Sequence, residues 1–195
     1  FMRDYLEQAG GRVVVTREPG GAALGEEIRG LLLSHRHDGM TLAAETLLMF
    51  AARAEHLERV IRPALAEGHW VLCDRFTDAT YAYQGGGRGL ALERIAVLED
   101  WVQGALRPDL TLLFDLPVTV GLARARKRSA ADRFEREDMA FFERVRATYR
   151  ERAVRYSNRY RLVNADQSVE GVWAEVQNIL GKFLHSSLER SDILQ

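Results

Sequence analysis

The sequence predicts an α/β protein in which a parallel β-sheet is covered by helices on both faces. Three observations lead to this fold class. Four short apolar runs are spaced along the 195 residues, as expected of strands that are buried on both faces. Segments with helical periodicity separate these runs, which is the order of elements in a parallel α/β fold. Polar residues follow each run directly, at the edge of the sheet where such folds bind ligands.

The predicted strands are short and rich in β-branched, aromatic and other large apolar residues. The first follows a Gly-Gly turn and leads into a loop that contains Pro19 and two glycines. The second ends at Asp74 and the third at Asp115, and Asn164 follows the fourth. The four strands are expected at residues 13–15, 70–73, 110–114 and 160–163.

Helices are predicted where apolar residues recur at spacings of three and four. Pro63 lacks an amide hydrogen, so it is expected to kink a long helix or to begin a new turn. The glycine-rich residues 84–89 are expected to break a helix and form a flexible connection. The polar tail after Leu184 is expected to be poorly ordered. After a short helical start, the predicted helices cover about residues 24–32, 42–66, 77–83, 92–106, 118–127, 135–155 and a last segment through Phe183.

The composition is that of one globular domain over residues 1–195. Hydrophobic residues make up 47% and charged residues 28%, and a net charge of −1 does not favour binding of a polyanion through bulk charge. Cys73 is the single cysteine, so we expect no disulfide framework and no multi-cysteine metal site. No run approaches the ~20 apolar residues that cross a bilayer, and no signal peptide opens the chain. We therefore expect a cytoplasmic protein without a membrane or nucleic-acid partner.

The pair Asp74-Arg75 is the sharpest local signal for a ligand site. An arginine that is fixed at a strand end beside a carboxylate can bind a phosphate through two parallel, charge-assisted hydrogen bonds. A structural ion pair is the alternative. Arginine accounts for 25 of the 27 basic residues, which suits phosphate binding but is also typical of some genome compositions.

Two groups of helical residues suit the binding of a base and a sugar. Thr80, Tyr83 and Gln84 are spaced by three and four residues, so a hydroxyl, a phenol and an amide share one helix face. Phe50 and Arg53 also share a face, where a ring could stack on a base and a guanidinium could donate to its carbonyl oxygen. The alternatives are a half-buried helix face and a core aromatic residue beside a snorkelling arginine.

Residues 124–133 concentrate five positive charges against one negative charge. Like charges repel, so this segment is either a solvated face or a clamp for an anion. Phosphoryl transfer spreads negative charge over the moving group, and arginines stabilise that charge. The segment is therefore a candidate for contact with phosphates in a reaction.

Other chemistries have weak support. The histidines show no spacing typical of metal ligands, so we expect them at the surface and expect no metal site formed by protein side chains. Cys73 lies within an apolar run, which favours a buried thiol over a nucleophile. No Gly-x-Ser-x-Gly motif is present to indicate a hydrolase of that type. The histidines are His35, His37, His56, His69 and His185.

Taken together, the motifs resemble those of bacterial thymidylate (dTMP) kinases. The resemblance extends from about residue 12 to about residue 180, with the motifs in the order of that family. Each motif alone is modest, but the combination is specific. The motifs are Thr16-Arg17-Glu18-Pro19-Gly20-Gly21, Phe50-Ala51-Ala52-Arg53, the stretch from Asp74-Arg75-Phe76 to Gly89, and Arg107-Pro108-Asp109-Leu110.

The resemblance implies a three-layer P-loop NTPase-type fold with a five-stranded parallel sheet, a homodimer, and transfer of the γ-phosphoryl group of Mg-ATP to dTMP. It implies that Arg75 holds the dTMP phosphate, with Asp74 near the metal and the phosphates. It also implies that Arg53 contacts the thymine and that Tyr83 disfavours a ribose 2′-hydroxyl. The other residues implied to border dTMP are Glu18, Pro19, Phe50, Thr80 and Gln84.

For ATP, the resemblance implies a mobile lid at about residues 124–138. Arg128 is the implied transition-state arginine, which joins Arg75 and Asp74 in the catalytic set. Arg124 and Arg133 are implied to contact ATP as well, and Ala165 to border the adenine. The resemblance therefore places the two nucleotides side by side across the carboxyl ends of the strands.

The sequence departs from the family pattern in two places. The stacking phenylalanine of the family lies four residues before the thymine-binding arginine, but Met49 holds that place here; we expect Phe50, one position later, to cover the base. A Gly-x-x-x-x-Gly-Lys-[Ser/Thr] loop is not among the 195 residues. We therefore expect that the sequence omits N-terminal residues with this P-loop and the first, central strand, and that Mg²⁺ is bound through that loop, water and phosphates.

Three alternatives stay open on the sequence alone. The first is a kinase for another nucleoside monophosphate, which the combination of Arg53 and Tyr83 disfavours. The second is an inactive nucleotide-binding relative without a P-loop. The third is a binding module whose arginine-rich segment contacts nucleic acid; the near-zero net charge and the nearby Glu135, Glu137 and Asp138 disfavour it.

Overall fold

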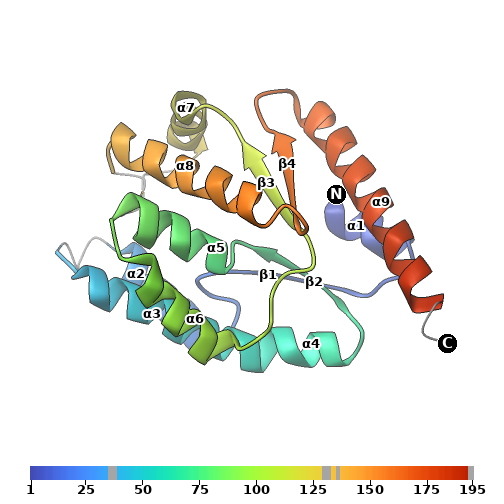
Figure 1. Cartoon of the computed structure of the whole chain (residues 1–195), viewed down its shortest axis with the longest axis horizontal. Helices are drawn as coiled ribbons and strands as arrows, with labels where there is room; N and C mark the ends of the chain where they lie inside the picture. The colour runs from blue at the N-terminus through green and yellow to red at the C-terminus, as the bar shows by residue number, and fades with distance from the viewer. Residues whose placement is uncertain (35–38, 129–132, 135–136, 193–195) are drawn as a thin grey trace.

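The computed structural model describes residues 1–34, 39–128, 133–134 and 137–192 (Figure 1). In this part of the chain, strands and helices alternate as the sequence predicts. The strands are β1 (Val13–Arg17), β2 (Trp70–Asp74), β3 (Thr111–Asp115) and β4 (Tyr160–Asn164). The helices are α1 (Met2–Gln8), α2 (Ala23–Leu33), α3 (Leu42–His56), α4 (Arg62–Ala66), α5 (Thr77–Thr80), α6 (Leu92–Gln103), α7 (Val118–Arg128), α8 (Met139–Arg155) and α9 (Val169–Asp192), with π-helices η2 (Leu57–Ile61) and η3 (Tyr81–Gly87).

The strands form two parallel pairs. β1 pairs with β2, with Val13 opposite Trp70 at one end of the ladder. β3 pairs with β4, with Thr111 opposite Tyr160. Among the described residues, no ladder joins the two pairs, so the predicted sheet is divided into two halves (Figure 1). The parallel pairing confirms the fold class.

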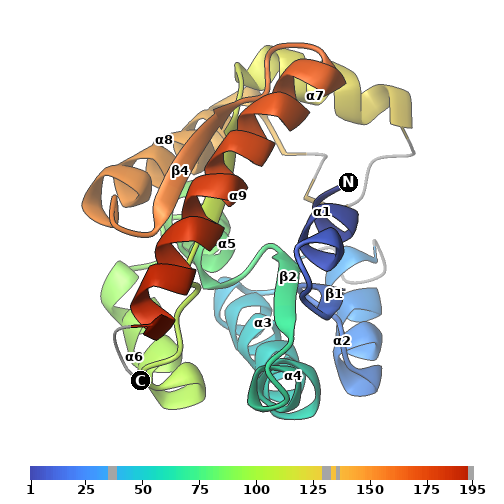
Figure 2. The same cartoon turned by 90° about the vertical axis from the view of Figure 1, so that its right-hand side faces the viewer.

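Each pair of strands is covered by its own helices. α1 packs on β1 and α4 packs on β2, whereas α8 and α9 pack on β4. Figure 2 shows α8 and α9 on either side of β4. α1 and α9 also contact each other, because the ring of Trp173 lies 5.9 Å from that of Tyr5. The helices thus cover the strands only in part, and apolar strand residues such as Val15 and Phe114 remain exposed.

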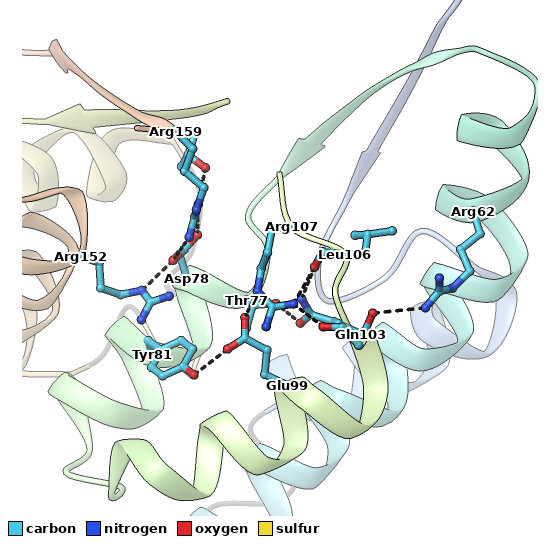
Figure 3. A network of polar contacts seen from close by, with 12 residues as sticks. Arg62, Thr77, Asp78, Tyr81, Glu99, Gln103, Leu106, Arg107, Arg152 and Arg159 are labelled. Carbon is cyan, nitrogen blue, oxygen red and sulfur yellow. Dashed lines mark hydrogen bonds and ion pairs between the residues drawn. The ribbon is translucent and has the colours of Figure 1, made fainter. Parts of the chain in front are cut away.

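Asp78 on α5 joins the two halves of the molecule (Figure 3). Its carboxylate accepts a hydrogen bond from Arg152 Nε of α8 at 2.6 Å. It accepts two more from Arg159, just before β4, at 2.8 and 2.9 Å. Because α5 begins three residues after β2, this cluster connects the first pair of strands to the second.

The prediction that residues 84–89 form a flexible connection is wrong. Most of this stretch continues the helix as η3, which packs against α8. A Cβ atom added at Gly86 would lie 2.9 Å from Thr148 Cβ, and one at Gly87 would lie 2.8 Å from Phe141 Cζ. The glycines are therefore present because α8 approaches the backbone closely.

Two smaller predictions concern helix ends. Pro63 lies in the first turn of α4, where its missing amide hydrogen is tolerated, and the interruption before it is η2. After Leu184 the chain continues as part of α9 to Asp192, and the expectation that this tail is poorly ordered stays a prediction. None of the described helices is both long and apolar enough to cross a membrane.

Candidate active site

The residues predicted to bind dTMP begin at the carboxyl ends of β1 and β2. The backbone amide of Glu18 donates to the carbonyl of Asp74 at 3.0 Å, which extends the ladder by one residue. The side chains of Asp74 and Arg75 are exposed. Arg75 has a φ of 67°, a left-handed conformation that costs a residue with a Cβ atom roughly 1–2 kcal/mol. Strain of this kind is concentrated at functional sites, so the structure supports a special role for this arginine.

Arg53 is a buried arginine whose guanidinium is only partly paired. Its side chain is 3% exposed, and its Nε donates to Glu18 Oε2 at 2.8 Å. Its Nη2 donates to Thr80 Oγ1 at 3.0 Å. Its Nη1 is buried and has no hydrogen-bond partner among the described residues. A buried donor without an acceptor is unfavourable, so the geometry of Nη1 suits a ligand that brings a carbonyl oxygen.

Phe50 supports Arg53 from within the core. Its ring is 2% exposed and packs with Tyr81 and Ile95. The centre of the Arg53 guanidinium lies 4.7 Å from the centroid of the ring. Met49 is half-buried and packs against an apolar cluster of Ile28 and Leu32 of α2 and Ala52 of α3. The shared face of Phe50 and Arg53 is thus confirmed, whereas stacking of Phe50 on the base stays a prediction.

Tyr83 lies between Arg75 and α8. The Arg75 guanidinium lies over the Tyr83 ring, 5.1 Å from its centroid. The edge of the same ring contacts Phe134 and Phe141, with centroids 5.9 and 6.0 Å apart. Arg75 and Arg53 therefore contact the same helical segment about one turn apart, through Tyr83 and Thr80.

Gln84 faces α3 and takes part in a buried polar cluster. Its Nε2 donates to Glu45 Oε1 at 2.8 Å, and Arg88 Nε donates to the same oxygen at 2.8 Å. Arg133 Nη2 donates to the other oxygen at 2.6 Å, and its Nε donates to the carbonyl of Leu32. Arg133, predicted to contact ATP, is thus held on a buried carboxylate in this structure. Its contact with ATP stays a prediction.

Glu18 is held on one side by Arg53 and on the other by His56. His56 is fully buried, and its Nδ1 lies 3.0 Å from Glu18 Oε1. Its Nε2 lies 2.6 Å from Thr16 Oγ1. The expectation of a surface position is therefore wrong for His56. Pro19 completes the loop, where its carbonyl accepts a hydrogen bond from Arg29 at 2.9 Å.

Two of the residues predicted to border ATP, Arg124 and Ala165, lie above β3 and β4. Arg124 of α7 donates to the carbonyl of Ala165 at 2.7 Å, so the structure brings these two residues together. Asp115 accepts two hydrogen bonds from Arg146, which hold the pKa of that carboxyl below its usual value despite partial burial. Arg128 ends α7, and its side chain lies outside the described residues, as do residues 129–132 and 135–136 of the predicted lid.

A cavity lies at the opposite end of the strands. It has a volume of about 1110 Å³ and is bordered by residues at the amino ends of β2 and β3, such as Trp70 and Leu110. It contains none of the residues predicted to bind dTMP or ATP. Within the described ranges, no group of three or more His, Cys, Asp or Glu residues could hold a metal ion.

Sequence reasoning missed two buried polar residues of α3, Glu45 and His56. Both lie at helical spacing from Ala52 and Arg53, on the face of α3 that packs against the rest of the protein. A charged residue at a position where the periodicity predicts an apolar one is a signal for a buried polar contact. That signal is visible in the sequence, but the partners are not.

A parallel α/β protein with arginines and hydrogen-bonding side chains at the carboxyl ends of its strands belongs to the broad class that binds nucleotides there. Comparison with known proteins narrows this class. The sequence matches the family model of thymidylate kinases over residues 1–176. The thymidylate kinase of Pseudomonas putida is 61% identical over 182 residues, which covers 91% of this chain and 87% of that protein. That of Pseudomonas syringae is 60% identical over 186 residues, which covers 93% and 89%.

A solved structure gives the same result. The crystal structure of the thymidylate kinase from Ehrlichia chaffeensis superimposes with a TM-score of 0.75 at 32% identity. The match covers 92% of this chain and 87% of that one. The chain therefore belongs to the thymidylate kinase family, a family of P-loop kinases.

Proposed function

We propose that the residues at the ends of β1 and β2 bind dTMP and that the residues above β3 and β4 contact ATP. As a thymidylate kinase, the chain transfers a phosphoryl group from ATP to dTMP. An oxygen of the dTMP phosphate attacks the γ-phosphorus, the bond to the bridging oxygen breaks, and ADP and dTDP leave. The residues of the site position the two nucleotides and stabilise the charge that is spread over the moving group.

Arg75 is the group that binds the dTMP phosphate in this proposal. Its left-handed backbone and its exposed side chain at the end of β2 support the assignment. Tyr83 lies against its guanidinium, 5.1 Å from the ring centroid, and a planar guanidinium matches the geometry of phosphate oxygens. Asp74 lies beside the phosphates. We propose that Mg²⁺ is bound there mainly by phosphates and water, as this ion prefers.

Arg53 recognises the base. Its Nη1 is buried without a partner, and a carbonyl oxygen of thymine would supply the missing acceptor. Thr80 and Glu18 hold the other two nitrogens of the guanidinium, and Phe50 supports its plane. Tyr83 lies at the sugar, where its bulk disfavours a 2′-hydroxyl, and Gln84 and Pro19 complete the walls of the pocket.

The donor side of the proposal rests on Arg124 and Ala165, which are hydrogen bonded at 2.7 Å. Ala165 borders the adenine, and Arg124 approaches the phosphates from α7. We propose a lid at about residues 124–138, of which residues 129–132 and 135–136 lie outside the described part of the chain, in a single kinase domain over residues 1–195. Arg128 supplies the transition-state charge from this lid, and Arg133 joins the ATP contacts when the lid closes.

We also propose that the enzyme is a cytoplasmic homodimer. Leu31 of α2 and Leu47 of α3 are 44% and 54% exposed, and apolar side chains in such positions suit a contact between copies. Light scattering after gel filtration tests this point, and a monomer at micromolar concentration would contradict it.

The unpartnered Nη1 of Arg53 is the single observation that carries the proposed base specificity. A coupled assay of ADP release with dTMP, dUMP, dCMP, dGMP and UMP tests it on the full-length protein. We expect a strong preference for dTMP. Cytosine carries an amine where thymine carries a carbonyl, and a site built to make a hydrogen bond strongly disfavours a substrate that cannot make it. Equal rates with dCMP would contradict the assignment.

A further inference from the structure

His56 contacts one of the predicted ligand residues, Glu18, through a hydrogen bond. It is fully buried, with Nδ1 3.0 Å from Glu18 Oε1 and Nε2 2.6 Å from Thr16 Oγ1. A carboxylate only accepts hydrogen bonds, so the proton of the Glu18 contact is on Nδ1. The hydroxyl of Thr16 can then donate to Nε2, which gives both ring nitrogens a partner.

His56 divides the two oxygens of Glu18 between two donors. Oε1 meets His56, which leaves only Oε2 for Arg53 Nε at 2.8 Å. A carboxylate beside an arginine otherwise prefers a fork of two parallel hydrogen bonds. Because that fork does not form, Arg53 Nη2 donates to Thr80 instead. The histidine therefore influences the orientation of the guanidinium, and with it the direction of Nη1.

The ring of His56 also supports the loop that follows Glu18. A Cβ atom added at Gly21 would lie 2.5 Å from His56 Nε2, so the backbone of the loop lies directly on the ring. Gly21 has a φ of 81°, and its amide donates to Glu26 at 2.9 Å. His56 thus contacts both Glu18, which holds Arg53, and the loop that follows Glu18.

We propose that His56 is a positioning residue for dTMP: through Glu18, it keeps Arg53 oriented so that Nη1 can bind the base. This inference rests on the proposed contact between Arg53 and the base. In His56→Leu, Oε1 of Glu18 is free to compete with Thr80 for Arg53 Nη2. The guanidinium then turns toward Glu18, and Nη1 leaves the orientation in which it can bind the base.

The test is calorimetric binding of two ligands to the full-length protein. We expect His56→Leu to weaken dTMP binding about 10-fold or more, the effect of losing a hydrogen bond to a charged group. Binding of 2-deoxyribose 5-phosphate, which carries no base, is expected to stay within about twofold. In steady-state assays, the KM for dTMP rises while kcat and the KM for ATP stay within about twofold.

Matched variants separate positioning from a merely structural role. His56→Asn keeps a donor near the place of Nδ1, so we expect it to restore most of the dTMP affinity. Thr16→Val removes the partner of Nε2 and is expected to weaken dTMP binding several-fold, with Thr16→Ser as its control. The Thr16 pair also provides the test if His56→Leu does not fold, as judged by circular dichroism.

Two results would overturn the inference. One is unchanged dTMP affinity in a folded His56→Leu protein, or in Thr16→Val if His56→Leu does not fold. The other is equal weakening of dTMP and of the base-free ligand, which would indicate general damage to the site. Arg53→Gln distinguishes this failure from failure of the proposed function. If Arg53→Gln leaves dTMP binding unchanged, the proposed contact between Arg53 and the base is wrong. If Arg53→Gln weakens dTMP binding but the His56 and Thr16 variants do not, only the role of His56 is wrong.

Discussion

Replacement of Asp78 by asparagine tests how the two halves of the molecule are held together. The Asp78 side chain is 8% exposed, and those of its partners Arg152 and Arg159 are 11% and 10% exposed. Asparagine keeps the shape but removes the charge, and its amide nitrogen would face two guanidinium groups. Removing one partner of a buried ion pair costs about 3–5 kcal/mol. For a chain of 195 residues, this loss lowers the melting temperature by roughly 6–20 °C.

The difference in stability between the wild-type protein and Asp78→Asn is expected to depend on pH. Burial acts to raise the pKa of Asp78, but the hydrogen bonds and charges of Arg159 and Arg152 outweigh it, so the pKa lies below its usual value. A carboxylate with a lowered folded-state pKa stabilises the protein above its unfolded pKa of about 3.9, and the contribution is lost as the pH falls through the folded pKa. The difference between wild type and variant is thus constant from about pH 5 to 8 and shrinks below about pH 4.

Urea unfolding followed by circular dichroism measures both effects. Asp115→Asn is the matched control, because that carboxylate also accepts two hydrogen bonds from an arginine, Arg146, but the pair is more exposed. We expect it to cost only about 1–2 kcal/mol. A change below about 1 kcal/mol in Asp78→Asn, or equal changes in the two variants, would refute the reasoning.

Three further predictions concern the site and the packing around it. Arg75→Ala is expected to lose on the order of 2–5 kcal/mol of transition-state binding, measured as kcat/KM for dTMP; an unchanged value removes Arg75 from the phosphate site. Arg128→Ala is expected to lower kcat more than the affinity for dTMP, and an unchanged kcat removes it from the mechanism. Gly86→Ala places a methyl group against Thr148 and is expected to destabilise the fold by about 1–3 kcal/mol in urea unfolding. Gly30→Ala in α2, where a Cβ atom meets open space, is the control and is expected to be neutral or stabilising by up to about 1 kcal/mol. A larger loss of stability in Gly30→Ala than in Gly86→Ala would contradict the packing argument.

Local patterns in the sequence determine the order of the elements and the place of the site. Apolar runs and helical spacings depend on neighbouring residues, so the strands and most helices are where the sequence predicts them. The rule that parallel strands end at one edge of a sheet leads directly to Asp74 and Arg75. The pairing of Phe50 with Arg53 follows from their spacing of three residues on a helix.

Contacts between distant segments were decided only by the tertiary structure. Glu45 accepts hydrogen bonds from Gln84, 39 residues away, and from Arg133, 88 residues away. His56 reaches Glu18 across 38 residues, and Gly86 has no side chain because α8 lies against it. A buried polar group is stable only when a partner meets it, and helical periodicity says which side of a helix a residue occupies but not which residue lies across from it.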